Sequence, residues 1–246
     1  MNIGHVRHCT VYQLRRAIKA SPALYMAASR LRHSRISGSL EPSQMMEPSV
    51  LNPRTQIVIE GPRRSGNTFA VVAFRVAQPA PIDVGHHLHA AAHVITAVKR
   101  EVPCLVLLRD PEDTVVSSVA SFPPTTVSQA LGDYVSFYER LTPHRERFLV
   151  ATFEQVTTDF GMVISALNER FGTVFTRFDH TDENVARCFR LIEQRYDRAL
   201  KAAHTVARPS QDRHEHKQEL RKRYLTDTRA EQRERAQYLF DMFSPS

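Results

Sequence analysis

The stretch from Gln56 to Phe69 reads QIVIEGPRRSGNTF and decides the fold. An apolar run that ends at a glycine indicates a buried strand entering a tight turn. From Asn67 to Gln78, apolar residues recur at helical spacing, which predicts a helix directly after the turn. Gly61, four intervening residues and then Gly66-x-Thr68 form the frame of a phosphate-binding loop.

The chemistry of this loop depends on where its cation lies. A strand–turn–helix points backbone N–H groups and the positive end of a helix dipole at one spot, which favours an anion. Asn67 stands where a nucleotide-hydrolysing loop carries the lysine that reaches the terminal phosphates of ATP. The cation is instead Arg64, whose planar fork suits phosphate or sulfate oxygens. The alternative interpretation is an ordinary strand–turn–helix with two surface arginines.

A second apolar run, residues 102–108, predicts another buried strand, and it ends in Arg109-Asp110-Pro111. Pro111 suits the first turn of a helix, and the two acidic residues after it favour a helix N-terminus. Arg109 therefore lies at the carboxyl end of a strand, where open α/β sheets bind ligands. Ser117 follows two helical turns further along.

Together the two motifs resemble the sulfotransferase superfamily, whose members use 3′-phosphoadenosine 5′-phosphosulfate (PAPS) as sulfuryl donor. The resemblance covers roughly Thr55 to Phe175, with the motifs in the right order. It implies that Arg109 and Ser117, eight residues apart, hold the 3′-phosphate. It also implies that the 5′-phosphosulfate is held by the loop residues Arg64, Ser65, Gly66, Asn67 and Thr68.

The resemblance further implies a catalytic histidine before the second motif. His87 precedes Arg109 by 22 residues and is followed by a leucine, which matches the family pattern. His87 is the predicted general base, since a neutral imidazole accepts a hydroxyl proton near neutral pH. Many cytosolic members carry a lysine two residues before this histidine, where this chain has Gly85. Arg64 would stabilise charge on the bridging oxygen without passing a proton.

The histidines near position 90 also invite a metal interpretation, because His89 and His93 lie four apart, as on one helix face. Structural zinc sites usually include cysteines, and no His-Glu-x-x-His motif occurs. We therefore expect no metal, treat His89 and His93 as hydrogen-bonded, partly buried residues, and assign His86 no role.

Family members often close the 3′-phosphate site with a late basic segment. Arg208 and Arg213, at the start of a predicted helix that contains Leu220 and Tyr224, are the candidates here. Their surroundings do not match the usual Arg-Lys-Gly form, and a solvated helix face is an equally good interpretation.

The predicted fold class is α/β, a P-loop three-layer α/β/α arrangement around a central parallel sheet, with helical N- and C-terminal extensions. Strand signals at 56–60, 81–84, 104–108 and 148–153 alternate with helices, and a single domain over 51–246 accommodates them. After the last strand, Glu154 begins a predicted helix that runs through Asp159 to Gly172. Substrate-pocket loops are expected at 120–145 and 173–210, although the aromatic residues Phe122, Tyr134, Phe137 and Tyr138 are expected to be core.

Residues 1–50 form a basic arm in this interpretation. The first 40 residues carry seven of the 33 Lys and Arg residues and no acid, so the remainder is balanced at 26 basic and 26 acidic residues. One helix is predicted by the shared apolar face of Val11, Leu14 and Ile18. A second helix is predicted to start at Ser21-Pro22. The segment 37–53 has the composition of a linker. The arm packs on the domain in the first interpretation; contact with an anionic membrane surface, contact with an acidic acceptor and an organellar transit peptide are alternatives. The balanced remainder argues against nucleic acid.

Three cysteines without paired spacing indicate a reducing compartment. We find no apolar membrane span and no signal-peptide core, so the expected location is cytoplasmic.

The predicted function is transfer of a sulfuryl group from PAPS to an acceptor hydroxyl on a carbohydrate, lipid or small molecule, among which the sequence does not choose. Two alternatives stay open. A P-loop kinase or nucleotidase would want the missing lysine and a Mg²⁺-binding carboxylate, for which Asp110 is the convenient candidate. A non-catalytic nucleotide-binding module would keep the loop without turnover, and Gly85 keeps that alternative open.

Overall fold

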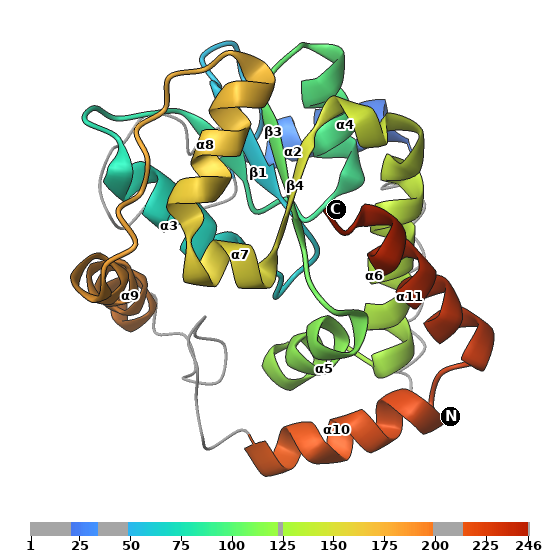
Figure 1. The fold of residues 1–246 in the computed structure, drawn as a ribbon. Helices are drawn as coiled ribbons and strands as arrows, with labels where there is room; N and C mark the ends of the chain where they lie inside the picture. Colours follow the sequence, from blue (N-terminus) through green and yellow to red (C-terminus); the bar gives the residue numbers. More distant parts are fainter. Residues whose placement is uncertain (1–20, 34–48, 123–124, 199–213, 246) are drawn as a thin grey trace.

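The computed structural model describes residues 21–33, 49–122, 125–198 and 214–245, whose arrangement is drawn in Figure 1. Strands and helices alternate through the centre of the chain, and helices alone follow the last strand. In order the elements are α2 (Pro22–His33), β1 (Ile57–Glu60), α3 (Asn67–Ala77), β2 (Val84–His86), α4 (Ala91–Lys99), β3 (Cys104–Leu108), α5 (Pro111–Ser121), α6 (Val127–Leu141), the 3₁₀ helix η2 (Thr142–Arg147), β4 (Leu149–Thr152), α7 (Phe153–Thr158), α8 (Phe160–Phe171), α9 (Asp182–Arg198), α10 (His214–Thr226) and α11 (Ala230–Phe243).

The four strands form one parallel sheet in the order β2-β1-β3-β4. After β1 the chain crosses to β2 at one edge, whereas after β3 it crosses to β4 at the other edge. The carboxyl ends of β1 and β3 are therefore neighbours whose connections diverge. Ligands of open α/β sheets bind at such a switch point.

Two apolar cores lie on opposite faces of the sheet. Along β1, Ile57 and Ile59 join one core while Val58 joins the other, as the alternation of side chains along a strand requires. One core is covered by α3, α8 and α9, and the other by α4, α5, α6, α10 and α11 (Figure 1). The predicted α/β class, with helices on both faces of a parallel sheet, is confirmed.

The edge strand was predicted in the wrong place. It was expected at 81–84, and it spans Val84–His86 instead. Pro81 has no N–H to give to a ladder, whereas Val84, Gly85 and His86 pair with Ile57, Val58 and Ile59. His86 therefore belongs to the sheet.

The helix expected to run through Asp159 is two helices. Asp159 adopts φ −151° and ψ 78°, which ends α7, and its carboxylate accepts a hydrogen bond from Met162 N to cap α8. Gly172, at φ 63°, ends α8 in the left-handed conformation, as expected for a helix cap.

Two segments expected to be irregular are ordered parts of the domain. Residues 127–141 form α6, with Tyr134, Phe137 and Tyr138 buried, so much of the expected 120–145 pocket loop is core. At the end of the expected linker, Ser49 makes an antiparallel bridge with His86 and Leu51 is buried.

The described part of the N-terminal arm is α2, which starts at Pro22 as predicted and packs against α4 with Met26 buried. The first predicted helix of the arm lies outside the described residues. Within the described ranges, no helix has both the length and the hydrophobicity that crossing a bilayer requires.

Candidate active site at the carboxyl edge of the sheet

The predicted site residues come from loops that leave one edge of the sheet. The phosphate-binding loop follows β1, the histidine segment follows β2, and Arg109 follows β3. Because these strands are parallel and adjacent, their carboxyl ends bring the three segments together, although Arg64 and Arg109 lie 45 residues apart.

The loop after β1 has the backbone geometry of an anion-binding turn. Gly66 has φ 92° and Arg64 has φ 71°, so two residues of the turn are left-handed. A Cβ at Gly66 would lie 3.2 Å from the Phe153 ring, so glycine is favoured there by space as well as by φ. No described side chain caps the N-terminus of α3. Its first N–H groups are therefore available to an anion.

The Asn67 side chain serves the loop itself. Its amide donates to the Pro62 carbonyl at 2.9 Å, and the residue is only 4% exposed. Asn67 thus braces the turn from inside, where a lysine would have reached outward. Thr68 lies at the first turn of α3, and its hydroxyl is 3.2 Å from His87 Nε2.

Arg64, Arg109 and Ser117, which the sequence analysis assigned to two different anionic groups of the donor, lie in contact in the structure. Arg64 Nε donates to Ser117 Oγ at 3.0 Å, and Arg109 Nη1 donates to the Arg64 carbonyl at 2.9 Å. The Arg109 guanidinium also lies over the Phe153 ring, 4.1 Å from its centroid. Burial lowers the pKa of Arg109, while nearby Asp113 opposes this shift. An additional anion would offset the cost of burying this charge.

Unsatisfied polar atoms concentrate at this site. Within the described part of the chain, four buried side-chain nitrogen or oxygen atoms have no hydrogen-bond partner of acceptable geometry. Three of them are Ser65 Oγ, Asn67 Oδ1 and Arg109 Nε, although the Tyr138 phenol lies close enough to Ser65 to interact with it. Buried polar atoms are rarely left unpaired in folded proteins, so this cluster is a candidate place for a polar ligand.

A chain of hydrogen bonds runs through the histidines to the loop. Arg75 Nη2 lies 3.1 Å from His86 Nε2, and His86 Nδ1 lies 2.6 Å from His87 Nδ1. Guanidinium groups only donate, so His86 Nε2 accepts and the proton of neutral His86 sits on Nδ1, facing His87. The proton of neutral His87 then sits on Nε2, where it is donated to the Thr68 hydroxyl. Burial lowers the pKa of Arg75 to about 10, so this donor stays charged at neutral pH.

His89 and His93 do not share a helix face, because α4 begins only at Ala91 and His89 lies before it with φ 49°. His89 Nδ1 is 3.0 Å from the Gly61 carbonyl, which fixes that nitrogen as a donor. His93 is fully buried and hydrogen-bonded, as expected of a structural histidine, and its partner is Glu60.

Gly85 has no room for a side chain. A Cβ there would lie 3.0 Å from the His93 ring and 3.0 Å from Val58. The volume that the family lysine would need is occupied by His93.

Sequence reasoning missed Glu60 and Arg221. Glu60 contacts the histidine segment, and only the fold reveals that contact, because its partners lie 28 to 33 residues further along the chain. Arg221, on α10, pairs with Glu112 at 2.9 Å and Asp113 at 2.6 Å. The predicted late basic residues Arg208 and Arg213 lie outside the described residues.

Among the residues that the structure describes, no group of three or more His, Cys, Asp or Glu side chains is arranged to hold a metal ion. A polar cavity of about 410 Å³ lies beside the junction of α7 and α8, lined by residues 158–159 and 177–180. Phe69, on α3, contacts Phe178 and His180 in its wall, so the cavity adjoins the helix that follows the loop.

No protein-family model matches the chain, and no curated protein matches it. Among solved structures, the chain is similar to mouse sulfotransferase SULT7A1 in complex with PAP, with 14% identity and a TM-score of 0.39. The match covers 82% of this chain and 93% of the mouse chain. A likeness of this size does not by itself fix a fold or an activity.

Proposed function

We propose that the protein is a sulfotransferase that moves a sulfuryl group from PAPS to an acceptor hydroxyl. The observation that carries the proposal is the meeting of Arg64, Arg109 and Ser117 at the switch point of the sheet. A donor with a 5′-phosphosulfate and a 3′-phosphate presents two anions, and the two motifs supply a place for each. Arg109 Nε, which is buried without a hydrogen-bond partner, would gain one.

Positive charge in the proposed reaction comes from the protein. Arg64 and the first N–H groups of α3 stabilise charge on the sulfuryl oxygens and on the leaving phosphate during in-line transfer. Arg109 and Ser117 hold the 3′-phosphate and so fix the position of the donor. No described group of side chains would hold a metal, and the proposed reaction uses none.

His87 accepts the proton of the acceptor hydroxyl in this proposal. His87 can accept a proton at Nε2 only in the tautomer that carries its own proton on Nδ1, the nitrogen that faces His86. In the structure the proton between the two Nδ1 atoms belongs to His86, because Arg75 donates to His86 Nε2. If Arg75 moves away, His86 Nε2 is free to take a proton from solvent, the Nδ1 proton passes to His87, and His87 releases its Nε2 proton to solvent, which leaves Nε2 able to act as the base.

A kinase or nucleotidase is less well supported. Asp110, the convenient Mg²⁺ ligand, caps α5 by accepting from Asp113 N at 2.9 Å. Asp113 and Glu112 are paired with arginines. Asn67 cannot replace the lysine of a kinase loop, since its amide is used inside the turn.

The test is thermal unfolding of the purified protein with 3′-phosphoadenosine 5′-phosphate (PAP), and separately with ATP and Mg²⁺. At one hundred times its dissociation constant, PAP should add about 2.7 kcal/mol to the free energy of unfolding. Stabilisation by ATP–Mg²⁺ alone would replace the sulfotransferase proposal with a kinase or nucleotidase.

The control uses two arginines that both lie over aromatic rings. Arg109→Ala should abolish the PAP shift, whereas Arg145→Ala should preserve it, because Arg145 lies over Phe243 of α11 and is not one of the proposed phosphate ligands. Loss of the shift in both variants would mean that the effect is not specific to the proposed site.

A further inference from the structure

We propose that Glu60 is a positioning residue that holds the histidine turn, His87 to His89, in its working conformation. The inference rests on the proposed function, since it concerns the base of that reaction. Glu60 ends β1 and directly precedes the phosphate-binding loop, so one residue connects the two halves of the site.

The histidine turn needs to be held because its backbone is unusual. His87 has φ 60° and His89 has φ 49°, and non-glycine residues rarely adopt the left-handed region. Such conformations persist only where surrounding contacts over-determine them, and they gather at functional sites. The question is which contacts impose this turn.

The Glu60 carboxylate supplies the two contacts that hold backbone N–H groups of the turn. Leu88 N donates to Oε1 at 2.8 Å, and His89 N donates to Oε2 at 3.0 Å. Each oxygen thus takes one N–H of the turn, and the side chain is 0% exposed, so water does not compete. Two backbone bonds to one carboxylate fix the orientation of the peptide units on both sides of Leu88.

His93 fixes the carboxylate in turn. Its Nδ1 lies 2.9 Å from Glu60 Oε1, and its Nε2 accepts from Leu51 N at 3.0 Å. Because Nε2 accepts, the proton of neutral His93 sits on Nδ1 and is donated to Glu60. The ring fits only because residue 85 is glycine. Gly85, His93 and Glu60 therefore act as one support, in the space that the family lysine would fill.

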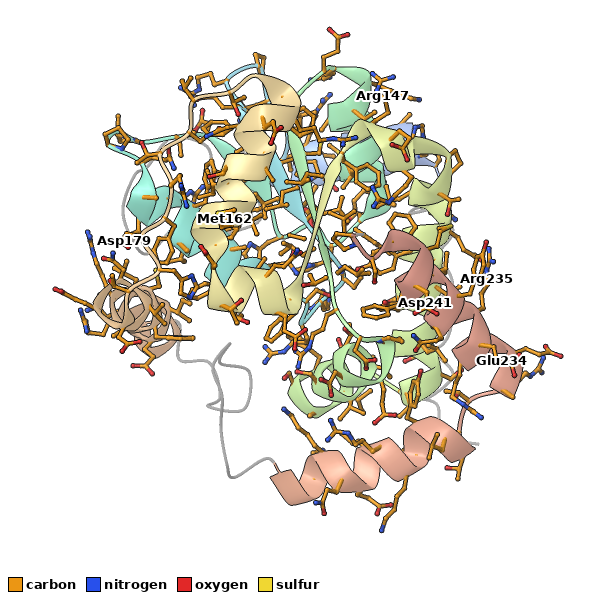
Figure 2. The ribbon with its side chains drawn as sticks, in the orientation of Figure 1. Arg147, Met162, Asp179, Glu234, Arg235 and Asp241 are labelled. Atoms are coloured by element: carbon orange, nitrogen blue, oxygen red, sulfur yellow. The ribbon has the colours of Figure 1, made fainter. Side chains whose placement is uncertain are left out.

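The test compares Glu60→Gln with Glu139→Gln, which makes the same chemical change in an exposed pair with Arg235, on the outer side of α11 (Figure 2). A glutamine has only one acceptor oxygen. In one orientation of its amide, Leu88 N and His93 Nδ1 would face the NH₂ group; in the other, His89 N would face it. We expect at least one of the Leu88 and His89 amides to exchange hydrogen rapidly in Glu60→Gln, and both to stay protected in Glu139→Gln.

The catalytic measurement separates positioning from folding. Glu60→Gln should lower kcat on the order of 10- to 100-fold, as loss of a supporting hydrogen-bond partner does. The PAP dissociation constant should not change, because the proposed phosphate contacts come from Arg64, Arg109 and Ser117. If Glu60→Gln does not fold, Gly85→Ala replaces it, since its Cβ displaces His93 without removing a hydrogen-bonding group.

The outcomes are distinct. Protected Leu88 and His89 amides in the variant would overturn the proposal, and so would unprotected amides with unchanged kcat. If the parent protein neither binds PAP nor transfers sulfate, the proposed function fails. Amide exchange alone then decides whether Glu60 holds the turn.

Discussion

At the scale of single residues, Asn67 shows why the loop favours one anion over another. Its amide is buried against Pro62, so the turn is closed from inside and no lysine extends from this position. Charge at the loop then comes from Arg64, which is already bonded to Ser117 of the second motif. In the proposed function, recognition of the donor is divided between the two motifs.

Asn67→Lys should lower the free energy of unfolding by about 1–3 kcal/mol, because the buried Pro62 carbonyl loses its donor. It should not create stabilisation by ATP–Mg²⁺, since Asp110, the convenient metal ligand, already caps α5. Urea unfolding of Asn67→Lys with and without each nucleotide measures both quantities.

Asn184→Lys is the matched control. The Asn184 amide also donates to a carbonyl, that of Asp179, but the contact is exposed. This variant should change stability little. An Asn67→Lys variant as stable as Asn184→Lys would contradict the bracing role of the amide.

At the scale of elements, α10 joins the site to the C-terminal helices. Arg221 binds Glu112 and Asp113 at the start of α5, and Asp113 also lies 3.4 Å from Arg109. The side chains of Arg221, Glu112 and Asp113 are 36% to 42% exposed, so solvent strongly screens the attraction between their charges. Docking of α10 depends instead on Leu220 and Tyr224, which are buried against α5 and α6.

Leu220→Ala should therefore cost about 2–5 kcal/mol of unfolding free energy, as core truncations do. Arg221→Ala should cost less than about 1 kcal/mol. Leu225→Ala, on the same helix but 59% exposed, serves as the control and should have almost no effect. Chemical denaturation of the three variants ranks them, and a larger loss for Arg221 than for Leu220 would contradict this account of docking.

Elements with local signals were predictable from the sequence, and elements set by distant partners were not. The start of α5 is encoded by Pro111 and two acids, and the turn before α3 by Gly61 and Gly66. Strand β2 was misplaced because it ends in histidines whose partners lie elsewhere in the chain. For the same reason Glu60 was treated as the end of an apolar run, although its carboxylate holds the histidine turn.

At the scale of the whole molecule, the sheet divides the interior into two cores that each contain one cysteine. Cys104 lies in the core under α4 to α6, and Cys188, on α9, lies in the core under α3 and α8. Burial raises the pKa of both thiols, that of Cys188 to about 11. The folded protein therefore offers almost no reactive thiolate from either residue at pH 8.

If the two cores unfold together, both thiols should become reactive at the same urea concentration. The measurement is alkylation at pH 8 over a urea series in a Cys9→Ser background, with each cysteine peptide quantified by mass spectrometry. Unfolded thiols react because their pKa returns to its ordinary value near 8.5. Labelling of Cys188 at lower urea than Cys104 would show that α9 opens on its own.

The crowding between Gly85 and the His93 ring also links two positions in evolution. A side chain at 85 would crowd the His93 ring at 3.0 Å, and a smaller residue at 93 would leave Glu60 without its donor. Each single replacement is thus disfavoured although the pair together could be viable, which is sign epistasis. A protein with Gly85 and His93 is therefore expected to acquire a lysine at 85 only if both positions change.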